Sequence, residues 1–348
     1  MVSNAKHINN YPISNFRHVP GVHCTSSAIR DVFEFHGLTM SEAMIFGLGS
    51  GLGLGYGKLG SENPIMGGRQ YRFEDNLCKL LNIELHKFMT NNKEEGWHRL
   101  RERIENGIPT AINVDMAYLP YQQLPKGFHF GQHAIVVAGY NPENSKVLIA
   151  DTHFPDLQKI SLDDLARARN SSYSRWMDPR NFMYEFSFPE KVPDPKDVIL
   201  IAIQKNGQNI LKKSRMMRIF GTTNGIDAIT KFVLDLEKLS IMSNPKLQER
   251  CDEIAGFISD YGTGGGLFRL LYSQFLEESA EFYPSLDSLG EFYKNLGMKW
   301  EEISQTVQRI PDSSDQERNQ IILVVVDILN KIKILEQKGA QKLQGYSH

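Results

Sequence analysis

The sequence predicts a mixed α+β domain over about residues 1–204 and an all-helical domain over residues 205–348. The 348 residues exceed the length at which a single hydrophobic core usually stops growing, so two domains are expected. Before residue 205, segments with a helical hydrophobic period alternate with strand-like runs, and turn residues are frequent. After it, almost every segment has the helical period.

The elements of the first part follow from the spacing of their apolar residues. Helices are predicted over 25–35, from about residue 41, over 72–81 and over 93–106. Strand-like runs cover 109–114, 134–138, 147–150, 183–188 and 198–203. Asn141-Pro142-Glu143-Asn144 has the composition of a turn, so it is expected to join the second and third of these strands as a hairpin.

The second part consists of predicted helices, over about 208–219, 224–242, 245–259, 266–282, 285–296, 299–309 and 315–337. Asn244-Pro245 and Asp312-Ser313-Ser314 are typical signals for the start of a helix. Gly264-Gly265-Gly266 interrupts the pattern before one of the helices. The sequence contains no internal repeat and no low-complexity segment.

Composition and charge limit the class of function. The formal net charge is −2, which gives no general attraction to nucleic acid or to an anionic membrane. The first fifteen residues lack the apolar segment of a secretory signal, and the longest aliphatic run, 321–326, is far shorter than a membrane span. Three cysteines without a CxxC pair indicate a reducing compartment. We therefore expect a cytoplasmic protein without nucleic-acid or membrane partners.

Cys24 comes directly before a predicted helix, in the string Gly21-Val22-His23-Cys24-Thr25-Ser26-Ser27. A thiol at a helix N-terminus meets partial positive charge and backbone amide donors, which stabilise a thiolate. Free cysteines are more often small buried residues. The position alone leaves both interpretations open, and a base is needed to decide between them.

His133 and Asp151 provide a candidate base and its orienting carboxylate. His133 opens one strand-like run, and Asp151 closes the next. A hairpin centred on Pro142 would set the two residues directly opposite each other, with their side chains on one face. A carboxylate in that position holds the imidazole in one tautomer, as the third member of a Cys–His–Asp triad does.

Each of these residues also has an ordinary structural interpretation. His133 can be a strand-end histidine with a satisfied hydrogen bond, and Asp151 can be a solvated strand end. Together with a cysteine at a helix start, however, they predict nucleophilic catalysis through Cys24. An oxyanion also needs hydrogen-bond donors. The backbone amide of Cys24 and the side chain of His18 are the candidates, although His18 can also be a plain loop histidine.

The order of these residues resembles the papain-like superfamily of cysteine enzymes, especially its double-glycine leader-peptidase branch. Papain-type enzymes carry a glutamine six residues before the cysteine, whereas this chain has His18 there, so it departs from that pattern at the oxyanion hole. The chain more closely resembles the BtrH-like family, named for an acyltransferase of butirosin biosynthesis. This resemblance spans most of the chain and rests on the segments GVHCTSSAIRDVFEFHGLTMSEAMIFGLGSGLGLGY, GQHAIVVAGY, VLIADTHF and GGGLFRLLYSQFLEESAEF.

The BtrH-like resemblance implies an amide-forming acyltransferase of a natural-product pathway. The acyl group would pass from the phosphopantetheine thioester of an acyl or peptidyl carrier protein to Cys24, and then to an amine acceptor. By the same resemblance, His133 is the base and Asp151 its orienting carboxylate. The carrier brings the phosphopantetheine, so no cofactor bound by the protein itself is implied. The alternatives are a cysteine peptidase or amidohydrolase with the same triad, and a non-catalytic binding protein on the same scaffold.

Three further residues are candidates for the cleft. The glycine-rich run 47–57 lacks a nucleotide-binding signature, so a flexible backbone cradle near the active site is expected, shaping a channel for the acyl chain or pantetheine. Tyr56 belongs to this run. His23 and His153 adjoin proposed triad positions, and a structural role is equally open for both.

The basic stretch 205–220 contains no acidic residue, which suits electrostatic docking of an acidic carrier protein, although a solvated helix face is the plainer interpretation. The candidate docking residues are Lys212, Lys213, Arg215 and Arg218. No metal site is predicted, because the spacing of His129 and His133 suits a helix that neighbouring proline and glycine residues oppose. No pattern in the sequence indicates whether the chain forms a homodimer, so its oligomeric state stays open.

Overall fold

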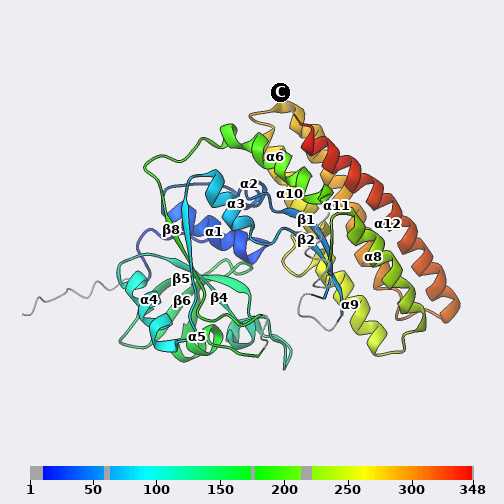
Figure 1. The fold of residues 1–348 in the computed structure, drawn as a ribbon. Helices are drawn as coiled ribbons and strands as arrows, with labels where there is room; N and C mark the ends of the chain where they lie inside the picture. The colour runs from blue at the N-terminus through cyan, green and yellow to red at the C-terminus, as the bar shows by residue number, and fades with distance from the viewer. Residues whose placement is uncertain (1–10, 59–62, 174–176, 213–221, 347–348) are drawn as a thin grey trace, which may run out of the picture. The chain divides into compact units, whose positions relative to one another are not determined.

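The computed structural model describes residues 11–58, 63–173, 177–212 and 222–346 (Figure 1). The chain forms two compact units: the first comprises Met1–Glu42 and Ile83–Lys191, and the second comprises Ala43–Asn82 and Val192–His348. This grouping differs from the predicted division at residue 204 in two respects. The boundary lies near residue 191, and the segment 43–82 folds with the C-terminal part.

The first unit is built on one antiparallel sheet of six strands. In spatial order the strands are β3 (Glu84–Phe88), β8 (Met183–Ser187), β4 (Thr110–Val114), β5 (His133–Asn141), β6 (Lys146–Ala150) and β7 (Gln158–Ser161). The four strands with buried apolar runs are those that the sequence predicts. β3 and β7 are short, partly exposed and rich in polar residues, so the hydrophobic pattern does not reveal them.

The two faces of this sheet carry different helices, because side chains along a strand alternate between faces. Ala134 and Val136 of β5 pack against α1 (Cys24–Phe35). The intervening residues of the strand pack on the opposite face, with α4 (Lys93–Glu105) and α5 (Leu162–Arg169) (Figure 1). Small alanine side chains on the first face let α1 lie close to the sheet.

The second unit is mostly helical, as predicted, with one small three-stranded sheet in the order β2-β1-β9. These strands are β1 (Leu52–Gly57), β2 (Ile65–Arg69) and β9 (Thr223–Asn224). The remaining α-helices in the described parts of the chain are α2 (Glu42–Leu48), α3 (Phe73–Leu80), α6 (Pro195–Leu211), α8 (Ile226–Leu236), α9 (Lys246–Ser259), α10 (Arg269–Ser279), α11 (Asp287–Val307) and α12 (Asp315–Gln344). Within the described residues, no helix is both long enough and apolar enough to cross a membrane.

One predicted strand, 198–203, is wrong, because these residues lie inside α6. Their β-branched side chains suggest a strand, but Asp194 accepts a hydrogen bond from the Lys196 amide and Pro195 occupies the first turn, which together start a helix. The two predicted helices over 285–296 and 299–309 are a single helix, α11.

The glycine-rich run 47–57 is ordered and packed inside the second unit, so the predicted flexible cradle is wrong. The run completes α2 and forms β1. A Cβ added to Gly47 would lie 2.0 Å from the Phe275 ring, and one added to Gly53 would lie 2.7 Å from the Arg69 backbone. The glycines are therefore needed for close packing.

A buried ion pair holds together several elements of the second unit. Arg269 on α10 and Glu336 on α12 are both 0 % exposed, and the guanidinium donates to the Glu336 carboxylate over 2.7 Å. Arg269 also donates to the carbonyl oxygens of Gly53 and Gly68 in the small sheet. The Trp300 indole donates to the same carboxylate oxygen over 2.8 Å. One charged pair thus links the small sheet to three helices.

Candidate active site

Cys24 is the first residue of α1, with His23 as the N-cap. Cys24, Ala28 and Val32 recur at intervals of four residues and share the face of α1 that packs on the sheet. That face contacts Ala134, which directly follows His133 at the start of β5. Helical spacing and the close approach of α1 to the sheet therefore bring the Cys24 thiol to the end of β5 where His133 lies. The thiol is half-buried.

His133 and Asp151 are in contact, although the predicted hairpin register is wrong. The predicted register sets them directly opposite each other, whereas in the structure Val136 of β5 pairs with Ala150 of β6. The turn lies between Asn141 and Lys146, later in the chain than a turn centred on Pro142, and this displaces the pairing. An irregularity between Val137 and Gly139 then takes back one residue of the displacement. Continuing this register sets Asp151 diagonally across from His133 on the same face, a spacing that an imidazole can span. His133 Nε2 lies 2.8 Å from Asp151 Oδ1.

Asp151 accepts hydrogen bonds from two further donors that the sequence does not predict. The Tyr121 hydroxyl and the Gln122 side-chain amide donate to Asp151 Oδ2 over 2.8 Å and 2.7 Å. Burial alone would raise the pKa of Asp151, but the charge of His133 and these hydrogen bonds outweigh it and lower the pKa. Asp151 is therefore a fixed anion. Tyr121 and Gln122 lie in a short loop helix without any sequence signal that links them to residue 151.

The electrostatics of His133 favour its charged form. Burial alone would lower its pKa, but the negative charge of Asp151, their hydrogen bond, and a hydrogen bond and charge from Cys24 raise the pKa of His133 to about 10. Because Nε2 faces Asp151, Nδ1 is left for Cys24. Cys24, His133 and Asp151 thus form one connected chain of polar groups.

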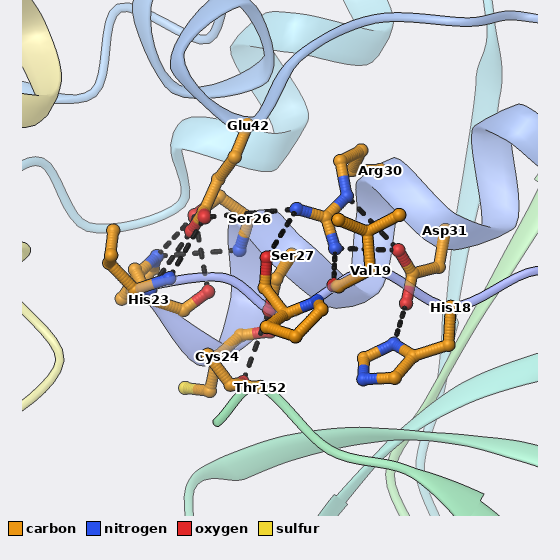
Figure 2. A network of polar contacts seen from close by, with 12 residues as sticks. His18, Val19, His23, Cys24, Ser26, Ser27, Arg30, Asp31, Glu42 and Thr152 are labelled. Carbon is orange, nitrogen blue, oxygen red and sulfur yellow. Dashed lines mark hydrogen bonds and ion pairs between the residues drawn. The ribbon is translucent and has the colours of Figure 1, made fainter. Parts of the chain in front are cut away.

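Glu42 organises the loop that leads into Cys24 (Figure 2). Its carboxylate accepts hydrogen bonds from the backbone amides of Val22 and His23 over 2.9 Å and 2.8 Å, and from the Ser26 hydroxyl over 2.8 Å. Gly21 is needed beside it, since a Cβ there would lie 2.6 Å from the carboxylate. Glu42 therefore fixes the backbone on which Cys24 is carried. Nothing in its local sequence indicates this long-range role.

His18 does not fit the predicted role as an oxyanion donor. Its Nδ1 lies 2.5 Å from Asp31 Oδ2, and its Nε2 lies 2.8 Å from the carbonyl oxygen of Phe154. Both acceptors require an N–H, so both ring donors are engaged within the protein. Burial opposes the charged form, but the hydrogen bond and charge of Asp31 raise the pKa of His18. His18 instead ties the loop before α1 to the segment after Asp151.

The three residues predicted to line the cleft differ in their exposure and in their contacts. His23 is 3 % exposed and accepts a hydrogen bond from the Ser26 amide as the cap of α1, which is a structural role. His153 is exposed in the turn after Asp151. Tyr56 is 1 % exposed within the second unit, where its ring packs against Phe232 and its hydroxyl accepts a hydrogen bond from Arg250, so it lines no open cleft.

Of the predicted docking residues, Lys212 is exposed at the end of α6. Lys213, Arg215 and Arg218 lie outside the described residues. The docking role of all four stays a prediction.

A second histidine–aspartate pair supports the loop that ends at His133. Asp115 accepts hydrogen bonds from His129 Nδ1 over 2.8 Å, from the Phe130 amide over 3.1 Å and from the Ser171 hydroxyl over 2.6 Å. His129 is therefore paired with a carboxylate. Across the described parts of the chain, no three histidine, cysteine or acidic side chains gather in a way that would hold a metal ion.

Two protein-family models match the chain. Residues 23–152 match the family described as butirosin biosynthesis protein H, N-terminal. Residues 163–343, more than half of the chain, match a domain of unknown function, DUF4872. The chain belongs to the BtrH-like family. This confirms the resemblance noted in the sequence and connects the protein with antibiotic biosynthesis.

The BtrH-like N-terminal match contains Cys24, His133 and Asp151. The boundary between the two matches does not follow the compact units, because α5 and β8 belong to the second match but fold in the first unit. The sheet that carries His133 is therefore completed by the second match. A search of the curated proteins finds no match to this BtrH-like chain.

Proposed function

We propose that this BtrH-like protein is a cysteine-dependent acyltransferase, which moves an acyl group from a carrier-protein thioester to an amine and forms an amide. The observation that carries the proposal is the chain of contacts from Cys24 through His133 to Asp151. Membership of a family named for butirosin biosynthesis supports an enzyme of the transferase class. We also propose that the first unit is a papain-like domain, since α1 carries the cysteine and packs on an antiparallel sheet that carries the histidine.

In the first step, the Cys24 thiolate attacks the carbonyl carbon of the carrier-bound thioester. A new carbon–sulfur bond forms at Cys24, the bond to the phosphopantetheine sulfur breaks, and the leaving thiolate takes the proton from the charged His133. A pKa of about 10 keeps His133 protonated at neutral pH for this transfer. One thioester replaces another, so the step is close to balanced in free energy.

In the second step, the amine nitrogen attacks the acyl carbon on Cys24. The carbon–sulfur bond breaks, Cys24 leaves as a thiolate, and the neutral His133 takes the proton that the amine loses. Asp151 stabilises the resulting imidazolium. The amide is far more stable than the thioester, which makes this step effectively irreversible. Backbone amides at the N-terminus of α1, including that of Cys24, are the proposed donors to the oxyanion.

The acyl donor is carried by a partner protein, and the acyl acceptor is a small-molecule amine. The phosphopantetheine arm belongs to an acyl or peptidyl carrier protein, so the enzyme needs no cofactor of its own. Carrier docking through Lys212, Lys213, Arg215 and Arg218 is part of this proposal.

Product analysis tests the reaction class. We expect an amide when the protein is incubated with an acylated carrier protein and an aminoglycoside, with release of the free carrier thiol, as measured by mass spectrometry. In a transferase, the amine must attack the acyl-Cys24 intermediate in preference to water. Free acid as the sole product, with or without the amine, would instead identify a hydrolase. A chain that forms neither product nor acyl adduct would contradict catalysis.

The pH profile tests the role of Asp151. We expect kcat/KM for the acylated carrier to stay level on the alkaline side until pH approaches about 10, where His133 loses the proton needed by the leaving thiol. Asp151→Asn removes the charge that raises this pKa, so the alkaline limb should move down toward about 6.5. The rate at the optimum should fall about 10²–10⁴-fold, since the imidazole also loses its orienting partner.

Asp115→Asn is the matched control, because it alters the other histidine–aspartate pair of the same unit, which has the same 2.8 Å separation. Its alkaline limb should remain near that of the wild type. An alkaline limb that Asp151→Asn leaves in place would refute the assignment of Asp151 as the partner of the catalytic histidine.

A further inference from the structure

A cavity of about 500 Å³ lies between α4 and α5 in the first unit. Its walls include Trp97, Tyr118, Leu162, Ala166 and Arg169. α4 and α5 cover the face of the sheet opposite α1, so the cavity is on the other side of the sheet from the helix of Cys24. None of its lining residues belongs to the Cys24–His133–Asp151 group.

Arg169 is the unusual residue of this cavity. It is 2 % exposed, and its Nε has no hydrogen-bond partner among the described residues. Among the described residues, its only side-chain hydrogen bond runs from Nη2 to the carbonyl oxygen of Gly96 over 2.7 Å. Burial lowers the pKa of Arg169 to about 10, with no contribution from a neighbouring charge, so the guanidinium is still charged at neutral pH.

A buried cation without a carboxylate partner is unfavourable, because water is lost and no counter-charge replaces it. The other charged groups of the cavity do not remedy this. Lys93 and Arg167 are exposed, as are Glu94 and Asp163, so the cations and anions at the rim balance. Arg169 is left as the one uncompensated charge in the described lining.

The rest of the lining indicates which kind of ligand body would lie beside a group bound to Arg169. Trp97, Tyr118, Leu162 and Ala166 offer aromatic and aliphatic surface next to Arg169. A guanidinium binds planar carboxylates and phosphates through paired N–H groups. We infer that this cavity is a second binding site, for a small organic anion that joins a carboxylate or phosphate to an aromatic or other apolar body.

The inference is tested by binding of two probe anions to the full chain. Phenylacetate and phenyl phosphate represent the two anionic groups, and phenylacetamide is the uncharged control. By isothermal titration calorimetry, we expect at least one anion to bind, at least about tenfold more tightly than phenylacetamide, because a charge-assisted hydrogen bond is lost in the amide. The tighter of the two anions identifies the preferred group.

Two variants locate the binding. Arg169→Met keeps the aliphatic stem but removes the charge, and Ala166→Phe fills the cavity from an exposed position of α5 while keeping Arg169. Both should lose anion binding, and Ala166→Phe keeps the test decisive if Arg169→Met does not fold. Failure of both anions to bind the wild type would overturn the inference. So would equal binding of phenylacetamide, or unchanged anion affinity in a folded variant.

Discussion

Replacing Cys24 by alanine is expected to reduce acyl transfer by at least about a thousandfold, as loss of a covalent nucleophile does in related mechanisms. The variant should also form no covalent acyl adduct. Alanine keeps the helix start and fits the face on which Cys24, Ala28 and Val32 pack against the sheet, so the fold should be preserved. Only the sulfur that attacks the thioester is removed.

Two measurements check this result. The rate of amide formation gives the loss of activity, and the intact mass of the protein after mixing with an acylated carrier reports the acyl adduct. Far-UV circular dichroism of the variant verifies the fold. An acyl adduct on the alanine variant, or amide formation near the wild-type rate, would end the assignment of Cys24 as nucleophile.

The two other cysteines provide matched controls. Cys78 and Cys251 are 2 % and 0 % exposed, and burial raises the pKa of the Cys251 thiol to about 12. A thiol that stays protonated at neutral pH is a poor nucleophile. We therefore expect Cys78→Ala and Cys251→Ala to form the acyl adduct and to retain acyl transfer.

Replacing Glu336 by glutamine is expected to lower the free energy of unfolding of the second unit by about 3–5 kcal/mol, the usual effect of removing one partner of a buried ion pair. Arg269 would keep its charge at a position that is 0 % exposed, without an anion beside it. The Trp300 indole would keep an amide oxygen as its acceptor at best. Urea unfolding followed by far-UV circular dichroism measures the change.

An exposed ion pair on the same helix serves as the comparison. Asp327 and Lys331 lie 2.6 Å apart on the surface of α12, where solvent screens their attraction. Asp327→Asn should leave the unfolding midpoint close to that of the wild type. Equal midpoints for Glu336→Gln and the wild type would mean that the buried pair does not stabilise the unit.

Several elements were predictable because their signals are local. The helices predicted over 25–35, 93–106 and 245–259 agree closely with α1, α4 and α9, since a clear helical period defines each one. Side chains of His23 and Asn92 also cap the starts of α1 and α4. The strand predicted over 198–203 failed because a buried helix and a buried strand can share a short apolar run. There, the capping residues before the run carried the correct signal.

The candidate site was predictable in part. A thiol at a helix start and two polar residues at strand ends are visible in the sequence, and the structure brings His133 to Asp151. The expected register was wrong by a small shift, because the turn lies later in the chain than expected. The predicted contact between His133 and Asp151 still forms, because diagonal neighbours on one face of a sheet are within reach of an imidazole.

Other parts of the site were not predictable. His18 lies six residues before Cys24, which suggests an oxyanion donor, yet Asp31 and Phe154 engage both of its ring nitrogens. Glu42 supports the loop before Cys24 from a helix start that looks ordinary in the sequence. Arg169, whose Nε has no hydrogen-bond partner among the described residues, resembles any basic residue near the end of a helix.

The sequence alone determined where the helices and strands with strong periods lie, that a cysteine begins one helix, and that a histidine and an aspartate border a hairpin. These features depend on interactions within a few residues, so one sequence carries them. Only the tertiary structure decided which side chains are partners: Asp31 for His18, Glu42 for the loop before Cys24, and none in the described chain for the Nε of Arg169. Such pairings join distant positions through the packing of whole elements, and hydrophobic periodicity contains no information about them.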